Sequence, residues 1–178
     1  MQVQAIFISI LIMGIISGGA KIELGGSDDL RYWFITNDGV MGGLSRGNIK
    51  ENKNSLTFYG NISLENNGGF SRVQRQMQHK DLSAFKGIKV KLKGDGRKYD
   101  FTLEKHNNYV GPTFRKSFVA EEKWKTYYFA FDEFDESFFG RKMGRKLSEW
   151  NDIQRIGVIL ADKKPGPFEI EIDWIDFE

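Results

Sequence analysis

The residues of this sequence that could do chemistry lie in two segments rich in glycine and polar side chains. Residues 37–47 read NDGVMGGLSRG, and residues 66–73 read NNGGFSRV. Asn37 and Asp38 carry side-chain oxygens that could coordinate Ca²⁺. The alternative is a turn, because Asn, Asp and Gly tolerate left-handed backbone angles. We favour the turn, and we expect no metal and no cofactor.

Other kinds of reactive site find little support. The glycine spacing of residues 42–47 fits neither GxGxxG nor a Walker loop, so it does not predict phosphate binding. The chain has no cysteine, and His79 and His106 stand in polar surroundings without a metal-ligand spacing. No Gly-x-Ser-x-Gly element marks a nucleophile. We therefore expect no catalytic residue, and we predict that the protein is not an enzyme.

A binding surface is indicated by two arginines that lie close to aromatic residues. Arg72 follows Phe70 by two residues, and Arg97 precedes Tyr99 by two. A guanidinium group offers five donors in one plane, which suits a carboxylate, a backbone carbonyl or a pair of sugar hydroxyls. If their strands are neighbours, both arginines face one patch with the 37–38 loop at its rim. The predicted binding residues are Asn37, Asp38, Arg72, Arg97 and Tyr99.

A purely structural role is the alternative for both arginines. Each would then pair with a local carboxylate, such as Asp95 or Asp100. Under the binding interpretation Arg72 is exposed, so its replacement should change stability by less than about 0.5 kcal/mol. The periodicity of the sequence leaves both interpretations open.

Strands with alternating apolar and polar residues dominate the rest of the chain. A period of two is typical of strands with one buried face. Residues 124–131 (WKTYYFAF) are apolar on both faces, so they predict a central, covered strand. Helical turns are expected only at 82–85 and 147–152. The other expected strands are residues 56–64, 88–92, 99–103, 114–119, 155–161 and 168–174.

These elements predict an all-β protein, an antiparallel β-sandwich of the jelly-roll kind with one or two short helices. Residues 88–92 and 99–103 flank a Gly-Asp-Gly sequence and predict a β-hairpin. Lysines alternate along residues 88–93 and carboxylates along residues 168–174. We expect these two strands to be neighbours with their charges on the solvent side.

The N-terminal segment predicts export. Residues 5–16 are continuously apolar, and no charged residue precedes Lys21. The run is shorter than the roughly 20 residues that span a bilayer, and small residues lead up to Ala20. We predict a signal peptide at residues 1–20 and an exported single domain at 21–178, periplasmic or extracellular, with no membrane span. The alternative is a first buried strand or helix.

Composition limits the partners. The chain has 178 residues and a net charge of +2, with acidic and basic residues interspersed. No run of five or six like charges occurs. This balance argues against nucleic acid and against an anionic membrane surface as partners.

Four motifs carry a resemblance to a known family. They are residues 33–45 (WFITNDGVMGGLS), 66–73 (NNGGFSRV), 94–99 (GDGRKY) and 166–175 (GPFEIEIDWI). In order and spacing, over residues 28–178, the sequence resembles the complex I intermediate-associated protein 30 family. The resemblance implies a galactose-binding-like β-sandwich.

The same resemblance implies a function. Mitochondrial members of the family act as assembly chaperones for respiratory complex I, which is not an enzymatic role. We therefore expect a non-catalytic binding domain with a chaperone or assembly-type role on a protein partner. The predicted export would separate this chain from complex I intermediates. The alternative is an exported glycan-binding module, which rests on the galactose-binding-like fold alone.

Overall fold

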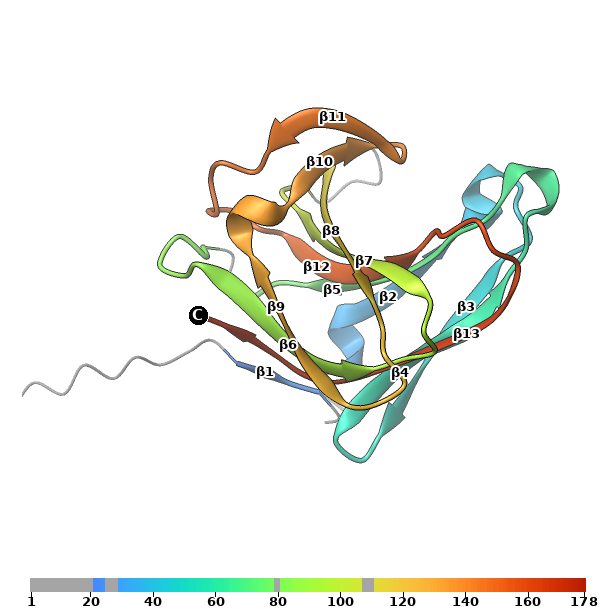
Figure 1. The fold of residues 1–178 in the computed structure, drawn as a ribbon, viewed down its shortest axis with the longest axis horizontal. Helices are drawn as coiled ribbons and strands as arrows, with labels where there is room; N and C mark the ends of the chain where they lie inside the picture. The colour runs from blue at the N-terminus through green and yellow to red at the C-terminus, as the bar shows by residue number, and fades with distance from the viewer. Residues whose placement is uncertain (1–20, 25–28, 79–80, 107–110) are drawn as a thin grey trace, which may run out of the picture.

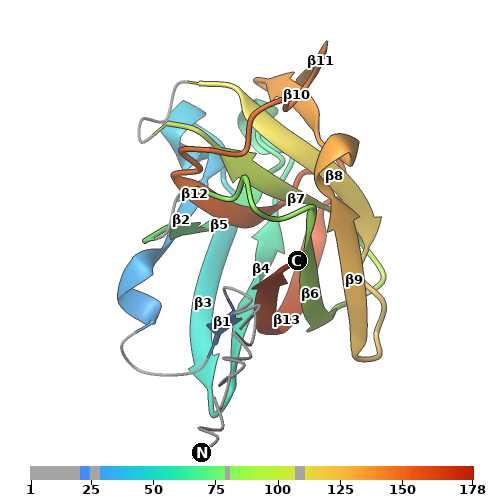
Figure 2. The same cartoon turned by 90° about the vertical axis from the view of Figure 1, so that its left-hand side faces the viewer.

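The fold is built from strands in two sheets that face each other (Figures 1 and 2). The structure is a computed structural model, and it describes residues 21–24, 29–78, 81–106 and 111–178. Within these ranges the helices are the 3-10 turns η1 (Leu30–Tyr32), η2 (Asp38–Met41), η3 (Glu65–Asn67) and η4 (Phe131–Glu133). The strands are β1 (Ile22–Glu23), β2 (Trp33–Asn37), β3 (Arg46–Asn52), β4 (Ser55–Ile62), β5 (Ser71–Gln76), β6 (Gly87–Lys93), β7 (Lys98–Glu104), β8 (Thr113–Val119), β9 (Lys125–Ala130), β10 (Asp135–Phe138), β11 (Arg141–Lys146), β12 (Arg155–Leu160) and β13 (Gly166–Phe177).

Strands from distant parts of the chain are neighbours in both sheets. The six-stranded sheet has the order β3-β4-β13-β6-β9, with β1 beside β13. The seven-stranded sheet has the order β11-β10-β8-β7-β12-β5-β2. All pairs are antiparallel, and the last two strands, β12 and β13, each insert between earlier ones. The predicted antiparallel β-sandwich is confirmed.

A ladder of ion pairs joins β6 to β13 on the solvent side. Lys91 and Asp173 approach to 2.8 Å, as do Lys93 and Glu171, and Lys89 pairs with the C-terminal residue Glu178. The expected pairing of the lysine strand with the acidic strand is confirmed. Because these side chains are partly exposed, each pair contributes no more than about 1 kcal/mol to stability.

The hairpin predicted for residues 88–92 and 99–103 is wrong. β6 and β7 belong to different sheets, and the segment between them crosses from one sheet to the other. The backbone N–H groups of Gly94 and Gly96 donate to the carbonyls of Glu121 and Ala120, both at 2.7 Å. A Cβ on Gly94 would lie 2.4 Å from the Ala120 Cβ. Gly94 thus serves close packing on a later segment, whereas Gly96 supplies a left-handed backbone angle, with a φ of +79°, in the crossing segment.

The central position predicted for residues 124–131 is also wrong. β9 is the edge strand of the six-stranded sheet, paired with β6. Phe129 is buried, but Tyr128 on the opposite face is 46% exposed. The indole of Trp124 lies beside the ammonium groups of Lys91 and Lys93, 5.7 and 5.0 Å from its centroid. Trp124 and Tyr128 tolerate exposure to water on one side. The indole of Trp124 contacts two ammonium groups, and the ring of Tyr128 ends in a polar hydroxyl.

The helical turns expected at 82–85 and 147–152 are not helices. The Ser83 N–H donates to the Asp81 carboxylate at 2.9 Å, which forms an Asx turn in place of a helix cap. The Leu82 N–H donates to the Trp150 carbonyl at 2.8 Å, so a backbone hydrogen bond between the two segments takes the place of one within a helix. Among the described residues, no helix has the length and apolar character needed to cross a bilayer.

Aromatic side chains from both sheets fill the space between them. Phe101 of β7 is fully buried, and its ring centroid lies 5.3 Å from that of Phe129 on β9. Phe134, just after η4, approaches Phe101 at 6.4 Å. Phe101 therefore links the two layers of the close-packed interior.

We expect Phe101→Ala to lower the free energy of unfolding by about 3–5 kcal/mol, because the truncation leaves a cavity between the sheets. Urea denaturation followed by circular dichroism measures the change. Tyr128→Ala, on the outer face of β9, should change it by less than about 0.5 kcal/mol. Equal effects of the two substitutions would contradict the assignment of the core.

Candidate binding surfaces

The two glycine-rich segments meet at the buried carboxylate of Asp38. The Ser45 backbone N–H donates to Asp38 Oδ1 at 2.9 Å, and the Ser45 hydroxyl to Oδ2 at 2.5 Å. From the second segment, the N–H groups of Gly69 and Phe70 donate to Oδ2 at 2.6 and 3.3 Å. Burial alone raises the pKa of Asp38, but these hydrogen bonds outweigh it and hold the pKa below its ordinary value.

Glycines leave the space that this carboxylate occupies. A Cβ on Gly43 would lie 2.3 Å from the Asp38 Cγ, and one on Gly68 would lie 2.6 Å from Oδ2. Gly42 has a φ of +89°, which favours glycine. The composition of both segments thus follows from the need to enclose one side chain.

Asn37 has a similar role next to Asp38. Its Oδ1 accepts the Gly47 N–H at 3.0 Å and the Ser71 hydroxyl at 2.7 Å. The oxygens of Asn37 and Asp38 are therefore engaged by N–H and O–H donors, which a cation would have to displace. In the part of the chain that the structure describes, no group of three or more acidic, His or Cys side chains is placed to hold a metal. The geometry favours the turn over the Ca²⁺ loop.

This junction supports exposed apolar side chains, which we call the apolar loop surface: Val40, Met41, Leu44 and Leu64. Val40 and Met41 are 74% and 58% exposed, although the loop beneath them is fixed. η2 and η3 lie side by side at one end of the sandwich (Figure 1), where the Asn66 amide donates to the Gly42 carbonyl at 3.2 Å. A groove of about 690 Å³ runs past Leu44 and Leu64.

Arg97 is held by the segment that joins β12 to β13 and by the start of β13, and Tyr99 is held by Asp95. Arg97 binds the Asp162 carboxylate with two nitrogens, at 2.7 and 3.1 Å, and donates to the Pro167 carbonyl at 2.9 Å. Tyr99 is fully buried, and its hydroxyl donates to Asp95 at 3.0 Å. Burial is the main reason that the pKa of Tyr99 is strongly raised.

Arg72 lies away from this pair. β12 separates β5, which carries Arg72, from β7, so the strands are not the neighbours that a shared patch requires. Arg72 Nη1 reaches across β12 to Glu104 Oε1 at 2.6 Å. The expectation that Arg72 is exposed is wrong, because only 12% of its side chain is accessible. The carboxylates that the two arginines contact in this way are Glu104 and Asp162, and neither was expected from the sequence.

The contacts of the five predicted residues hold the fold together. A binding role for Asn37, Asp38, Arg72, Arg97 and Tyr99 stays a prediction.

A polar face that sequence reasoning missed lies on the outside of the seven-stranded sheet. In register, Gln74, Gly157, Thr102, Arg115 and Asp135 form one row across five strands. Buried polar atoms usually have hydrogen-bond partners, yet several on this face have none among the described residues. They are Thr36 Oγ1, Gln74 Nε2 and Oε1, Thr102 Oγ1 and Arg115 Nε, whereas Glu104 Oε2 lies 3.6 Å from Arg155 Nη1 in an ion pair.

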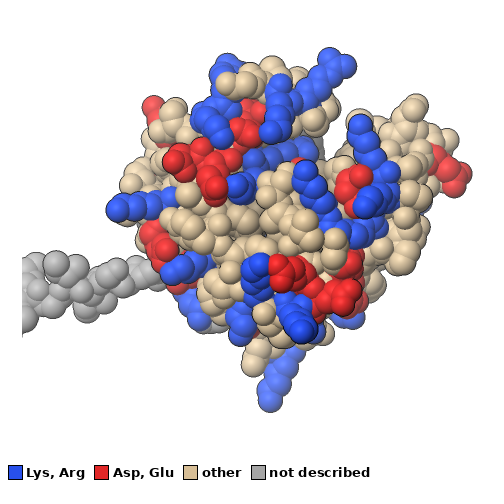
Figure 3. Space-filling view, viewed as in Figure 1, with Lys and Arg blue, Asp and Glu red and all other residues tan. Residues whose placement is uncertain are grey.

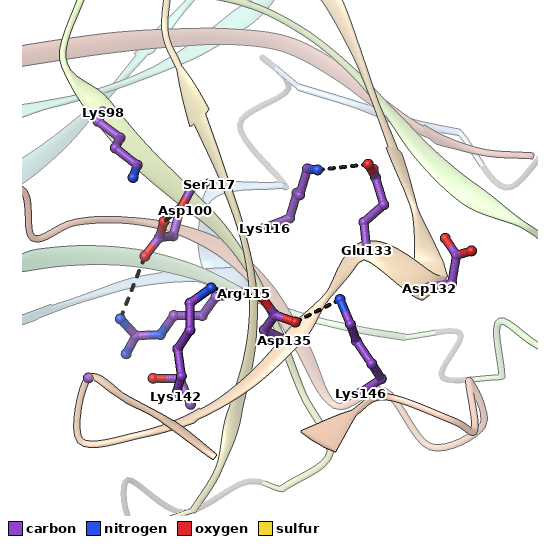
Figure 4. Close-up of a pocket in the computed structure, with 12 residues that line it drawn as sticks. Lys98, Asp100, Arg115, Lys116, Ser117, Asp132, Glu133, Asp135, Lys142 and Lys146 are labelled. Atoms are coloured by element: carbon purple, nitrogen blue, oxygen red, sulfur yellow. Dashed lines mark hydrogen bonds and ion pairs between the residues drawn. The ribbon is translucent and has the colours of Figure 1, made fainter. Parts of the chain in front are cut away.

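A pocket of about 590 Å³ opens on the same face, over β7, β8 and the β10–β11 hairpin (Figure 4). Its lining has five basic and four acidic side chains. Arg115 lies 3.8 Å from Asp100, and Lys146 lies 2.7 Å from Asp135. Burial lowers the pKa of Arg115 and Asp100 opposes this effect. The pocket can therefore offer both donors and acceptors to a ligand.

Comparison with known proteins identifies the family. The model of the family described as "Complex I intermediate-associated protein 30 (CIA30)" matches residues 22–172. The chain belongs to this family. A relative from Mus musculus, named "Complex I intermediate-associated protein 30, mitochondrial", is 29% identical over 175 residues, which cover 83% of this chain and 52% of the relative. The chain thus spans about half the length of that relative.

Solved structures with the same fold include carbohydrate-binding modules and an agarase. A family 11 module from Clostridium thermocellum, in complex with a β-1,3-1,4-mixed-linked tetrasaccharide, has a TM-score of 0.65 at 18% identity and covers 89% of this chain and 95% of its own. A family 29 module has a TM-score of 0.51 at 9% identity, covering 88% and 90%. An exo-β-agarase has a TM-score of 0.52 at 12% identity, covering 85% and 24%. At these identities the likeness shows the fold.

The comparisons also correct the expected location. Export to the periplasm or the extracellular space is wrong, because the name of the mouse relative places that family member in mitochondria, inside the cell. The apolar run on which the expectation rested belongs to residues 1–20, which lie outside the described residues. The domain boundaries at 20 and 21 stay a prediction.

We expect Asp38→Asn to lower the free energy of unfolding by about 3 kcal/mol at neutral pH, because an amide cannot accept all four hydrogen bonds. The native carboxylate has a lowered pKa, so its contribution is full above the ordinary value of 3.8 and is lost as the pH falls through the native value. Urea denaturation across this range should show wild type and variant converging in acid.

Asp132→Asn provides the matched control, because Asp132 is exposed and lies outside the junction. That variant should follow the wild-type stability at every pH. If Asp38→Asn differs from wild type by a constant amount down to about pH 2, the assigned role of the carboxylate is wrong.

Proposed function

We propose that this chain is a non-catalytic binding domain with an assembly-type role, which holds a protein partner on the apolar loop surface. Membership of the complex I intermediate-associated protein 30 family supports such a role. The observation that carries the proposal is that Val40 and Met41 are exposed on a loop fixed from below by Asp38.

The chemistry of this surface suits a protein partner. A loop that is already ordered loses little conformational entropy on binding, so more of the contact energy is available for affinity. Methionine is flexible and polarisable, and it adapts to irregular apolar surfaces. Charged side chains lie around this end of the sandwich (Figure 3), but the four side chains of the apolar loop surface are themselves uncharged, which lowers the cost of removing water from them.

The partner that we propose is an assembly intermediate of respiratory complex I. This choice rests on the name of the mouse relative, "Complex I intermediate-associated protein 30, mitochondrial". A partner of this kind exposes apolar surface that later subunits cover, and an apolar loop surface on the present chain would cover it in the meantime.

The test uses the tagged chain with detergent-solubilised mouse mitochondria. Wild type should migrate with complex I subunits on native gels. The double substitution Val40→Ser and Met41→Ser should abolish this comigration while changing stability by less than about 0.5 kcal/mol, because both side chains are exposed. Val119→Ser changes an exposed apolar residue at the last position of β8, and this variant should comigrate with complex I subunits as wild type does. Comigration that survives the double substitution would show that the apolar loop surface is not the site.

A glycan-binding function is the second candidate, and the polar face favours it. The pocket on this face is lined by five basic and four acidic side chains and by the hydroxyls of Ser117 and Ser137, so it offers donors, acceptors and groups that can do both. Sugar hydroxyls also donate and accept, whereas an anion would leave the acceptors unpaired. The family 11 module, found with a bound tetrasaccharide, has the same fold.

Calorimetric titration with the β-1,3-1,4-mixed-linked tetrasaccharide tests this candidate. Saturable binding should weaken about tenfold in Arg115→Met, because the variant loses charge-assisted hydrogen bonds in the pocket. Lys53→Met, an exposed change of the same charge in the β3–β4 turn, should bind as wild type does. Absence of any saturable heat would remove this tetrasaccharide as a ligand.

A further inference from the structure

The β10–β11 hairpin exposes aromatic side chains at its tip. Phe139 is 70% exposed and Phe138 is 37% exposed, and their rings contact each other with centroids 4.6 Å apart. All six residues of β11 are exposed, including Met143. Figures 1 and 2 show the hairpin standing out from the edge of the seven-stranded sheet. The apolar side chains here do not contribute to the core.

The backbone at the tip disfavours the residue that it carries. Phe138 pairs with Arg141, which leaves Phe139 and Gly140 as a two-residue turn with φ values of +45° and +76°. Turns of this kind favour Asn-Gly, and a bulky side chain at positive φ is an outlier. The phenyl ring gains nothing from burial in return. Folding alone therefore does not account for an aromatic residue at position 139.

Four basic residues follow the aromatic tip. Lys142 and Lys146 both pair with Asp135, and Arg145 pairs with Glu136. Residues 135–146 thus carry four basic side chains, Arg141 included, and two carboxylates, so the hairpin keeps a local positive surplus. The side chains of Lys142, Arg145 and Lys146 are 81%, 70% and 56% exposed even when paired. Their charges remain available to an external anionic surface.

We propose that the β10–β11 hairpin docks on a bilayer surface rich in anionic phospholipid. Phe138 and Phe139 enter the boundary between headgroups and acyl chains, where aromatic rings are favoured. The four basic residues contact the phosphate layer, where anionic lipid attracts them. The order of the side chains along the hairpin, apolar at the tip and basic behind it, matches the order of acyl chains and phosphate groups in a bilayer.

This surface is separate from the apolar loop surface, so the inference goes beyond the proposed function. It also differs from the expectation drawn from the overall charge. A net charge of +2 argues against an anionic membrane partner when the charges are mixed evenly. Here the surplus is local to one hairpin, and it coincides with the exposed aromatic pair.

Flotation of the full chain with phospholipid vesicles tests the proposal. Wild type should bind vesicles of equal parts phosphatidylcholine and phosphatidylserine, and should bind pure phosphatidylcholine vesicles at least about tenfold less. Added salt should weaken the binding. Equal binding to both vesicle types, or no binding to either, would overturn the proposal.

Phe139→Asn separates a membrane role from a structural one. Asparagine suits the left-handed turn, so the melting temperature should rise, while vesicle binding should fall about tenfold. Arg141→Glu should also weaken binding, whereas Lys53→Glu, the same charge change on the β3–β4 turn, should not. A lower melting temperature with unchanged vesicle binding would show that Phe139 serves the fold alone.

Two further outcomes distinguish this inference from others. The Val40→Ser and Met41→Ser variant should bind vesicles as wild type does. The proposal of vesicle binding by the hairpin and the proposal of partner binding by the apolar loop surface are therefore tested independently. If polyglutamate binds the hairpin and anionic vesicles do not, the surface recognises acidic protein segments, and the lipid proposal is wrong.

Discussion

The carboxylate of Asp38 is the interaction on which one whole end of the sandwich depends. It accepts bonds from Ser45, Gly69 and Phe70, so it joins the end of β2 to the starts of β3 and β5. A buried charge is tolerated only while all its partners remain, because an unpartnered carboxylate in the interior is very costly. This requirement explains why two glycine-rich segments far apart in sequence occur together. The loop that carries the exposed side chains of the apolar loop surface is held in place by these hydrogen bonds.

Alternation in the sequence predicts strands well, but it does not say which strands are neighbours. The charges of β6 and β13 identified one true pair, because complementary faces carry information about contact. The Gly-Asp-Gly sequence after β6 suggested a hairpin, yet the pairing of its glycines with Ala120 and Glu121 takes the chain to the other sheet. Arg72 gave no sign of burial, since its partner Glu104 lies 32 residues away. Such long-range pairs depend on register, which only the folded chain defines.

The effect of a charged side chain also depends on which residues the fold places next to it, and not on the net charge of the chain. Along β6, each lysine meets one carboxylate, from β13 or from Glu178 just after it, so that part of the surface is nearly neutral. On β11 the basic residues outnumber Asp135 and Glu136. A composition that balances over the chain therefore leaves one surface with a surplus. Beyond about 10 Å, salt screens distant charges, so this local surplus is what an approaching surface meets.

The polar face connects the surfaces that we assign. Its pocket is lined by Gly140, Lys142 and Lys146 from the hairpin as well as by Arg115 and Asp100 from the sheet (Figure 4). A bilayer that attracts the lysines competes with Asp135 for them, and so changes the wall of the pocket. A ligand in the pocket that uses the same lysines would withdraw them from the bilayer. If both surfaces bind as we propose, their occupation would be coupled through these shared lysines, whereas the apolar loop surface is composed of other residues and would bind independently.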